Sequence, residues 1–497
     1  MNFSKSKYCG LWQCPKIAWL TKYKPELCNV DETLLARMET GEQVGELAKG
    51  LFGTYIDVTT CDAEGNLDLQ SMQEKTAKCL QDGVENICEA SFSHNGLYCA
   101  VDILHKENDG YAIYEVKSST HESDVYFADI AYQRYVLNQC GLPIAKTYLI
   151  NINSEYVRQG DLDIHSFFKI TDVTKEVDEE SINTDIYIKG AESMLSHEEE
   201  PQVDLSEDCV DPYPCAFWKY CTRHLPTPSV FDLYRLPFTK KIEYYRKGLV
   251  SYEQLVYTDA VKNETRLRQV SFAINDCPPH IDQKGIKKFL DTLTYPLYFL
   301  DFETMQPAIP LFDGTSPYQQ IPFQYSLHYI EKEGGELQHK EFLAESGKDP
   351  RRAIAEQLVA DIPANVCVLA YNKSFECSRI KELAETFEDL SSHLLAIRDN
   401  IKDLLDPFRA GYYYNKAMGG SFSIKSVLPA LFPNDPSLDY HNLEGVHNGG
   451  EAMTVFPRIA QMPKEEAIIA RKNLLKYCCL DTYAMVKVWQ ELVRVTQ

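Results

Sequence analysis

The 497-residue sequence lacks the features that define several large classes of protein. No apolar run approaches the ~20 residues that span a bilayer, so no membrane-spanning segment is expected. Lysines near the N-terminus are not followed by an apolar stretch, so no secretion signal is expected either. No G-x(4)-G-K-[ST] motif occurs, so no P-loop ATPase is predicted.

Basic residues are scarce relative to acidic ones, with 50 Lys and Arg against 73 Asp and Glu and a net charge of −23. The imbalance is local: residues 172–208 hold 13 acidic residues and two lysines, whereas residues 235–268 hold eight basic and four acidic residues. Charge therefore neither supports nor excludes a nucleic-acid partner. The acidic segment is expected to be a solvated linker or loop, or alternatively a cover for a basic groove.

Cysteine is plentiful, and without a secretion signal the 16 cysteines predict thiols or metal ligands in a reducing cytoplasm. Cys209, Cys215 and Cys221 are spaced C-x5-C-x5-C, and Cys14 precedes a helix expected to start at Pro15. Four thiolates are enough for a [4Fe–4S] cluster. Zinc is the competing metal, and buried structural cysteines are the plain alternative.

Residues 297–304, Leu-Tyr-Phe-Leu-Asp-Phe-Glu-Thr, form a run typical of a buried strand. Asp301 and Glu303 are two positions apart, so both point to the same face of that strand. Two adjacent carboxylates repel each other unless a cation lies between them, and oxygen ligands suit Mg²⁺ or Mn²⁺. An acidic strand end that faces water is the alternative.

The N-terminal half has strand patterns at residues 86–92, 96–104 and 110–117, and helical patterns at 34–52, 68–82 and 129–142. Asp102 lies on the second strand, and Glu115 and Lys117 share a face of the third. Gln133 lies on the last of these helices. Two carboxylates can hold a metal ion that acidifies water, and a neighbouring lysine can position that water or offset phosphate charge.

This order of residues resembles the RecB-type branch of the PD-(D/E)XK nucleases over residues 1–225. The resemblance implies that Asp102 and Glu115 are metal ligands and that Lys117 is the catalytic lysine. It also implies that Gln133 is the glutamine of the helix and that Glu46 or Glu42 is the acid from the first helix. Glu89 is a weaker candidate, and a solvated helix edge is the alternative for Glu42 and Glu46.

The cysteines resemble those of the iron–sulfur members, including CRISPR-associated RecB-like and AddB-type nucleases, which implies a cluster held by Cys14, Cys209, Cys215 and Cys221. The spacing departs from the usual C-x2-C, and Cys9 could replace Cys14.

A second set of motifs lies in the C-terminal half. A strand pattern at residues 366–372 precedes a helix that carries Glu376 near its start. Residues 465–491 read as one or two helices, in which Tyr477 and Asp481 lie one turn apart on the same face. Helical patterns at 231–236, 240–247, 252–257 and 259–273 form the middle of the chain, where aromatic and basic residues alternate as core residues or as a guide for a nucleic-acid strand.

With Asp301 and Glu303, these motifs resemble the DEDDy subgroup of DnaQ-like 3′–5′ exonucleases, which have an RNase H-like fold. The resemblance implies four ligands for two metal ions and a tyrosine that orients the attacking water: Asp301, Glu303, Glu376 and Asp481, with Tyr477. Glu376 departs from the aspartate usual in the family, and Asp403 is a fallback ligand.

The expectation is an α/β protein with a restriction-endonuclease-like domain at residues 1–225, a helical bridge at 226–292 and an RNase H-like domain at 293–497. With both resemblances, the chain is similar to a group of prokaryotic proteins that contain two nuclease domains. They imply a cytoplasmic, Mg²⁺- or Mn²⁺-dependent nuclease acting on DNA, with single-stranded ends favoured, in repair, recombination or defence. A separate helicase would have to unwind duplexes. A catalytically decayed nucleic-acid-binding scaffold and an RNA exonuclease are the alternatives.

Overall fold

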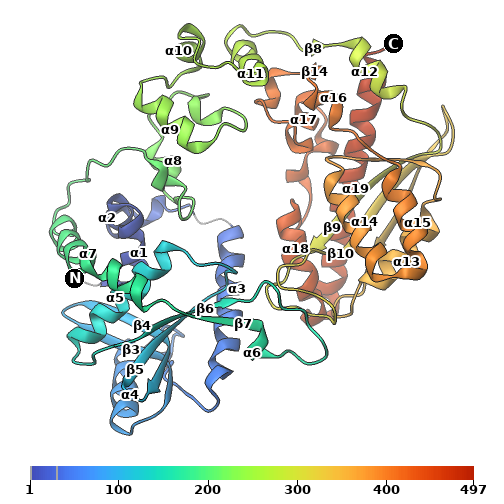
Figure 1. The fold of residues 1–497 in the computed structure, drawn as a ribbon. Helices are drawn as coiled ribbons and strands as arrows, with labels where there is room; N and C mark the ends of the chain where they lie inside the picture. The colour runs from blue at the N-terminus through green and yellow to red at the C-terminus, as the bar shows by residue number, and fades with distance from the viewer. Residues whose placement is uncertain (1–2, 30–31) are drawn as a thin grey trace. The chain divides into compact units, whose positions relative to one another are not determined.

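The computed structural model describes residues 3–29 and 32–497, which divide into two compact units (Figure 1). The first unit comprises Met1–His224 and Ala308–Tyr318, and the second comprises Leu225–Pro307 and Gln319–Gln497. Residues 226–292, expected as a helical bridge, belong to the second unit. Each unit is an α/β structure built on its own mixed sheet.

The first unit is built on a seven-stranded sheet with the order β2-β3-β4-β5-β6-β7, in which β1 also pairs with β4. The three strand patterns in this half are confirmed as β3, β4 and β5, which run antiparallel to one another. The strands are β1 (Phe3–Ser4), β2 (Ile56–Asp57), β3 (Asn86–His94), β4 (Leu97–Glu107), β5 (Gly110–Lys117), β6 (Thr147–Ile152) and β7 (Phe168–Asp172).

Helices cover both faces of this sheet, each over its own apolar core. Helices α1, α2, α4, α5 and α7 contribute to one core, and α3 and α6 contribute to the other. They are α1 (Lys5–Gln13), α2 (Pro15–Tyr23), α3 (Glu32–Ala48), α4 (Leu69–Gln81), α5 (Asp124–Gln139), α6 (Ile164–Phe167), α7 (Thr174–Leu195) and α8 (Trp218–Cys221), with the 3₁₀ turns η1 (Pro25–Leu27), η2 (Lys49–Phe52) and η3 (Glu207–Cys209).

The expectation that residues 172–208 form a loop is wrong over most of that segment, because they contain the 22-residue helix α7. Val177, Ile188 and Leu195 lie at helical spacing among the acidic residues and are buried in the core. Trp12 also donates a 2.9 Å hydrogen bond to Glu180. The high density of acidic residues concealed this apolar stripe in the sequence.

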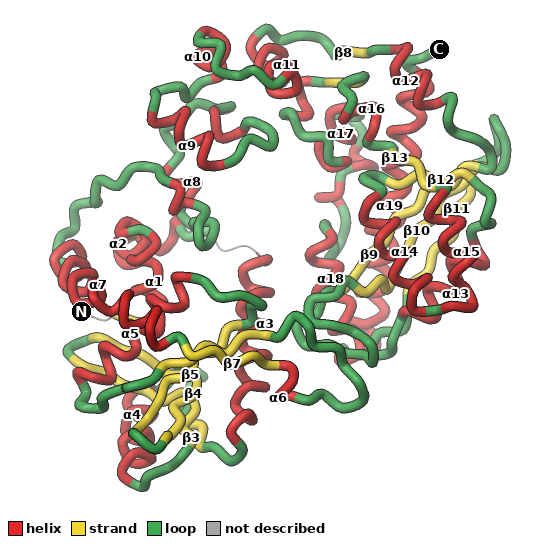
Figure 2. Tube along the Cα trace, viewed as in Figure 1, coloured by secondary structure: helices red, strands yellow, loops and turns green. Residues whose placement is uncertain are grey.

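The second unit is built on a five-stranded sheet with the order β11-β10-β9-β12-β13 (Figure 2). Side chains from β9 and β10 alternate between a core under α13, α14 and α15 and a face covered by α18 and α19. These elements are β9 (Leu297–Met305), β10 (Ile321–Ile330), β11 (Leu337–Leu343), β12 (Cys367–Ala370), β13 (Ile401–Asp403), α13 (Arg351–Asp361), α14 (Ser374–Thr386), α15 (Glu388–Asp399), α18 (Gly449–Arg458) and α19 (Lys464–Arg494).

The rest of the second unit is largely helical and includes a small apolar cluster of its own. Tyr252 is buried in that cluster, which places this aromatic residue in the core. The helix expected at residues 231–236 is only the short turn η4. The elements are η4 (Val230–Asp232), α9 (Phe238–Arg246), α10 (Tyr252–Tyr257), α11 (Glu264–Ile274), β8 (His280–Ile281), α12 (Gln283–Leu290), α16 (Asp406–Arg409), β14 (Tyr413–Tyr414), η5 (Lys416–Met418), α17 (Ile424–Leu431), η6 (Pro436–Leu438), η7 (Tyr440–Asn442) and η8 (Ile459–Gln461).

The connection between β9 and β10 contributes residues 308–318 to the first unit. Arg158 donates a 2.9 Å hydrogen bond to the carbonyl of Pro310, and the Gly160 amide donates a 2.9 Å hydrogen bond to Asp313. The Tyr318 hydroxyl donates to the carbonyl of Ser118.

None of the described helices, not even the 31-residue α19, combines the length and the apolarity that a bilayer crossing requires.

Candidate functional site

Four residues that the sequence predicts as a site converge in the first unit, on β4, β5 and α5. Lys117 Nζ donates 2.7 Å hydrogen bonds to Glu115 Oε1 and to Asp129 Oδ2. Gln133 Nε2 donates to the same two carboxylates, at 2.8 Å to Glu115 and 3.0 Å to Asp129. Asp102 reaches this group through its Oδ2 atom, which accepts a 2.8 Å hydrogen bond from the amide of residue 116.

Two members of this centre were missed in the sequence: Lys5 and Asp129. Lys5 Nζ lies between the two predicted metal ligands, 3.3 Å from Asp102 Oδ1 and 3.1 Å from Glu115 Oε1. Pairing of β1 with β4 brings it there, and nothing in the sequence indicated that pairing. Asp129 lies one turn before Gln133 on α5, a spacing that could have identified it.

Burial and charge shift the pKa values in the first centre. Burial raises the pKa of Glu115 to about 7, and the charges of Asp102 and Asp129 add to the effect. Burial would lower the pKa of Lys5 and of Lys117, but the surrounding carboxylates outweigh it and hold both above the ordinary value. Strongly shifted groups of this kind are concentrated in functional sites, although structural ion pairs also produce them.

The remaining acidic candidates of the first unit lie differently. Glu46 is 67% exposed and pairs with Lys49 at 2.6 Å, and within the described residues no hydrogen bond or ion pair joins it to Asp102 or Glu115. Glu42 and Glu46 instead line an open pocket beside α3. Glu89 lies in an irregular part of β3 with a φ of 55°, opposite Asp102. Burial, helped by the charge of Asp102, raises the pKa of Glu89 to about 7.

The pKa of Glu89 predicts a pH dependence of stability. Because its folded pKa lies above the unfolded value of about 4.5, the folded state binds more protons between pH 4.5 and 7, and stability falls as the pH rises through that window. Glu89→Gln removes this loss, so its melting temperature in EDTA should exceed that of the wild type at pH 8, with a smaller difference at pH 5. The exposed Glu85→Gln is the control, and an equal difference at both pH values would contradict the prediction.

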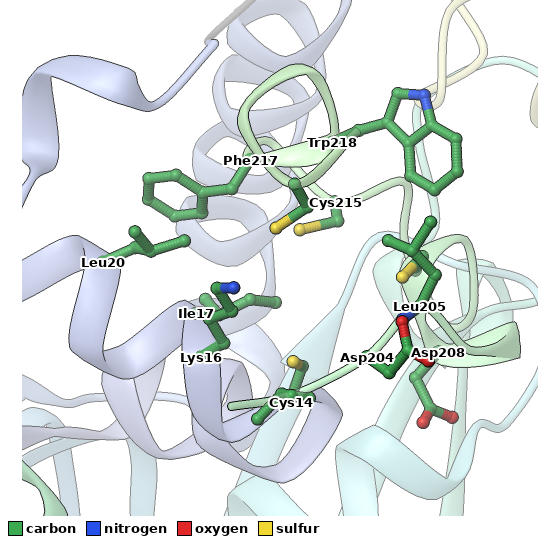
Figure 3. A pocket seen from close by; sticks show the side chains of 13 residues that line it. Cys14, Lys16, Ile17, Leu20, Asp204, Leu205, Asp208, Cys215, Phe217 and Trp218 are labelled. Atoms are coloured by element: carbon green, nitrogen blue, oxygen red, sulfur yellow. The ribbon is translucent and has the colours of Figure 1, made fainter. Parts of the chain in front are cut away.

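The four predicted cluster cysteines line one small pocket at the start of α2 and around α8 (Figure 3). Cys14 is the residue before α2, and Cys215 comes from the segment that faces it. The amide of Cys215 donates a 2.9 Å hydrogen bond to the carbonyl of Cys209, which closes the loop between them. Cys9 does not line this pocket, and its pKa is raised by burial and then by the charge of Asp129, which belongs to the first centre.

Sulfur is the only soft donor in this pocket, so the group that the donors fit is a cluster or a zinc ion. Burial raises the pKa of Cys215 to about 11, and burial likewise raises the pKa values of Cys209 and Cys221, with the neighbouring thiols adding to each shift. In the described part of the chain, however, the four sulfurs are not among the sets of three or more ligand atoms within 4.8 Å of one another. The cysteines therefore share a pocket without forming a closed ligand set.

A second group of predicted residues converges in the other unit, between β9 and α19. Asp301 and Glu303 project from the same face of β9, and one ligand atom from each and from Cys478 lie within 4.8 Å of one another. Asp481 is outside that set, but its charge shifts the pKa values of two of its members. Burial and then the charge of Asp481 raise the pKa values of Asp301 and Glu303 well above the ordinary range.

Two tyrosines and one lysine complete the second centre. The Tyr440 hydroxyl donates a 2.7 Å hydrogen bond to Asp481 Oδ1, and Tyr477 lies close enough to act on the pKa of Asp481. Burial raises the pKa of Asp481 to about 6, although both tyrosines and Lys425 act to lower it. Lys425 Nζ lies 5.4 Å from the ring centre of Tyr440 and 5.6 Å from that of Tyr477, and its charge acts on Asp301, Glu303 and Asp481. Lys425 lies at the start of α17 and Tyr440 in the 3₁₀ turn η7, and neither was predicted as a site residue.

Glu376 is buried near the start of α14, and burial raises its pKa to about 8. Its charge adds to the raised pKa values of Asp301 and Glu303, although Glu376 is outside their 4.8 Å set. Asp403, the fallback ligand, instead accepts hydrogen bonds from the amides of residues 372 and 405. Its charge also adds to the raised pKa of Glu376.

Each centre contains a buried oxygen atom that has no hydrogen-bond partner among the described residues: Gln133 Oε1 in the first and Glu376 Oε2 in the second. An unpaired buried oxygen costs free energy unless a cation or water satisfies it. Carboxylate and amide oxygens are the ligands that Mg²⁺ and Mn²⁺ prefer. The donor set therefore fits a hard divalent cation in the second centre, whereas in the first centre the Lys5 ammonium takes the position between Asp102 and Glu115 that such a cation would occupy.

Comparison with known proteins gives relationships but no established activity. A family model described as a domain of unknown function (DUF2779) matches residues 298–423, a stretch that contains Asp301, Glu303 and Glu376 but ends before Asp481. Uncharacterized protein UU173 of Ureaplasma parvum is 29% identical over 42% of this chain and 32% of its own length. Uncharacterized protein MG366 of Mycoplasma genitalium is 27% identical over 38% of this chain and 31% of its own length, and its Mycoplasma pneumoniae homolog is 25% identical over 42% and 34%. The chain thus aligns with about a third of the length of these relatives, and it is similar in part to a domain family of unknown function.

Proposed function

We propose that the protein is a metal-dependent nuclease with one catalytic centre in each unit, acting on single-stranded DNA ends. One observation carries the proposal: Asp301, Glu303 and Asp481 lie together between β9 and α19, with burial and mutual repulsion raising their pKa values. Buried like charges destabilise a fold, so a cation-binding role accounts for their presence. The expected RNase H-like fold for this unit belongs to the proposal.

In the second centre, Asp301, Glu303 and Asp481 would hold Mg²⁺ or Mn²⁺, with Glu376 as a further carboxylate. When bound, such ions acidify a water molecule and neutralise the charge of a phosphodiester. The hydroxyl of Tyr477, which lies close enough to Asp481 to act on its pKa, is suited to hold the attacking water. The exposed Lys425 supplies positive charge at the same place for the phosphate.

In the first centre, proposed to have a restriction-endonuclease-like fold, Asp102 and Glu115 would hold the metal ion in place of the Lys5 ammonium that now pairs with both. Lys117 is fixed by two 2.7 Å ion pairs, so its ammonium group is held in place to orient water or offset phosphate charge. Gln133 donates a hydrogen bond to Glu115 and another to Asp129, which fixes the positions of the two carboxylates. The cysteine pocket would hold a [4Fe–4S] cluster, or zinc, linking Cys14 to the segment that contains Cys209, Cys215 and Cys221.

The test is an assay of end-labelled single-stranded DNA with Mg²⁺ or Mn²⁺, comparing the wild type with the double variant Lys117→Ala, Asp301→Ala. The wild type is expected to shorten the DNA, and the double variant to leave it intact. Intact DNA with the wild type under both metals would overturn the proposal. If that DNA is nevertheless retained in a gel shift that weakens steeply with salt, a binding scaffold replaces it. RNA of the same sequence tests the substrate class.

A further inference from the structure

Another group of metal-ligating side chains lies on the same face of the five-stranded sheet, outside both proposed catalytic centres. His328 in β10 and His339 in β11 are direct cross-strand partners, and their ring centres are 4.4 Å apart. Cys479 comes from α19, which covers this face. One ligand atom from each of the three residues lies within 4.8 Å of the other two.

Hydrogen bonds occupy one nitrogen of each histidine ring. His328 Nδ1 lies 2.7 Å from Thr482 Oγ1, and His339 Nε2 lies 2.9 Å from Ser326 Oγ. The two hydroxyl oxygens are themselves 2.6 Å apart. Nε2 of His328 and Nδ1 of His339 are left as the lone-pair donors. This is the arrangement of metal-binding histidines, whose second nitrogen is held by a hydrogen bond that fixes the ring orientation.

We propose that His328, His339 and Cys479 bind a zinc-like divalent transition-metal ion that ties the edge strand β11 to α19. Two imidazole nitrogens and one thiolate form a borderline-soft donor set, which selects zinc over Mg²⁺. With metal–nitrogen bonds near ~2.0 Å and metal–sulfur bonds near ~2.3 Å, tetrahedral donors lie roughly 3.3–3.8 Å apart. The ligand atoms of the three residues are within 4.8 Å of one another. Side-chain rotations that move these atoms by about 1 Å would bring them to the tetrahedral spacing.

The surroundings agree with this assignment. Burial lowers the pKa of His328 to about 4 and lowers that of His339, so both rings are neutral near pH 7 and keep a lone pair for a metal ion. Glu341 lies two residues after His339 on the same face of β11, and its charge acts on both His339 and Cys479. It is therefore placed to supply a fourth, anionic ligand.

The site would stabilise the second unit and does not depend on the proposed nuclease function. Strand β11 is at the edge of the sheet, where pairing is available on one side only. The metal ion would join this strand to the stretch of α19 that also carries Tyr477 and Asp481. Ser326, which holds His339, is the cross-strand partner of Asp301, so the two sites are adjacent but use different ligands.

The experiment measures zinc by mass spectrometry in the full chain after EDTA treatment, reloading with zinc in excess Mg²⁺ and gel filtration. The variants are His339→Ala, whose side chain is exposed, and Cys479→Ser, which is half-buried. The matched controls in the same unit are His441→Ala, with a 92% exposed side chain, and Cys277→Ser, also half-buried. Hydrogen exchange of the 337–343 amides, with and without zinc, gives a local readout.

The wild type and both controls are expected to hold one more zinc equivalent than His339→Ala and Cys479→Ser. Zinc should slow amide exchange in β11 of the wild type and have no effect on it in His339→Ala. Equal zinc content in the wild type and in both site variants would overturn the proposal, as would exchange in β11 that does not respond to zinc. Zinc in the cysteine pocket cancels in these comparisons, because none of the variants alters that pocket.

Discussion

Asp301→Asn is expected to abolish degradation of single-stranded DNA ends by the second unit while leaving the protein at least as stable as the wild type in EDTA. Asparagine keeps the shape of the side chain but removes the charge that would bind a metal ion. Losing even an outer-shell partner of a metal ligand costs about 10–100-fold in activity, so loss of a direct ligand should cost more than about 100-fold.

Stability should move in the opposite direction to activity. Burial and the nearby Asp481 raise the pKa of Asp301 well above its ordinary value, so its ionised form is unfavourable in the folded state. A neutral asparagine removes that penalty. Loss of function with unchanged or raised stability is the mark of a residue kept for chemistry, because strain of this kind is retained at functional sites.

The measurement requires a background in which the first centre is silent. Lys117→Ala provides it, so the comparison is Lys117→Ala alone against the same chain with Asp301→Asn, on linear and on circular single-stranded DNA. Asp291→Asn, an exposed aspartate in the same unit, is the control. If Asp301→Asn lowers the melting temperature in EDTA as well as the activity, Asp301 is structural and the second centre is wrongly assigned.

The parts of the candidate sites that could be predicted from sequence are those fixed by local periodicity. Asp301 and Glu303 share a face because side chains alternate along a strand, and Glu115 and Lys117 meet for the same reason. Tyr477 reaches Asp481 because residues four apart lie on one side of a helix. These relationships hold wherever the element itself is correctly recognised.

The residues that were missed depend on tertiary contacts. Lys5 enters the first centre only because a two-residue strand pairs with β4. Tyr440 and Lys425 lie on the short elements η7 and α17, and only the tertiary fold brings them to the second centre. The insertion of residues 308–318 into the first unit has the same origin, since it is held by hydrogen bonds to residues such as Arg158 and not by any local pattern.

Helix α7 has a composition that predicts a loop. A high density of acidic residues favours an unstructured linker, yet Val177 and Ile188 are buried, which leaves the charges on the solvent side. Charge density describes the exposed face of such a helix and says nothing about the stripe beneath it. The same reasoning weakens any argument from the net charge of −23 about nucleic-acid binding, because a groove is defined by local charge.

Cys215→Ser is expected to remove the bound cofactor and to destabilise the first unit selectively. The four cysteines that line the pocket come from residue 14 and residues 209–221, so a cluster would cross-link the two ends of this unit. If the link is worth about 3 kcal/mol, in the middle of the range typical of a disulfide cross-link, the melting temperature of the unit should fall by roughly 6–12 °C.

The measurement is visible absorbance, iron, sulfide and zinc content of anaerobically purified protein, followed by limited proteolysis of residues 1–224. Cys61→Ser, an exposed cysteine of the same unit, is the control and should match the wild type. A brown protein that loses its colour in Cys215→Ser supports the [4Fe–4S] cluster, whereas a colourless protein with one zinc ion assigns the pocket to zinc. No metal in the wild type, with equal protease resistance in Cys215→Ser, would mean that the raised thiol pKa values reflect burial alone and that the pocket is part of the core.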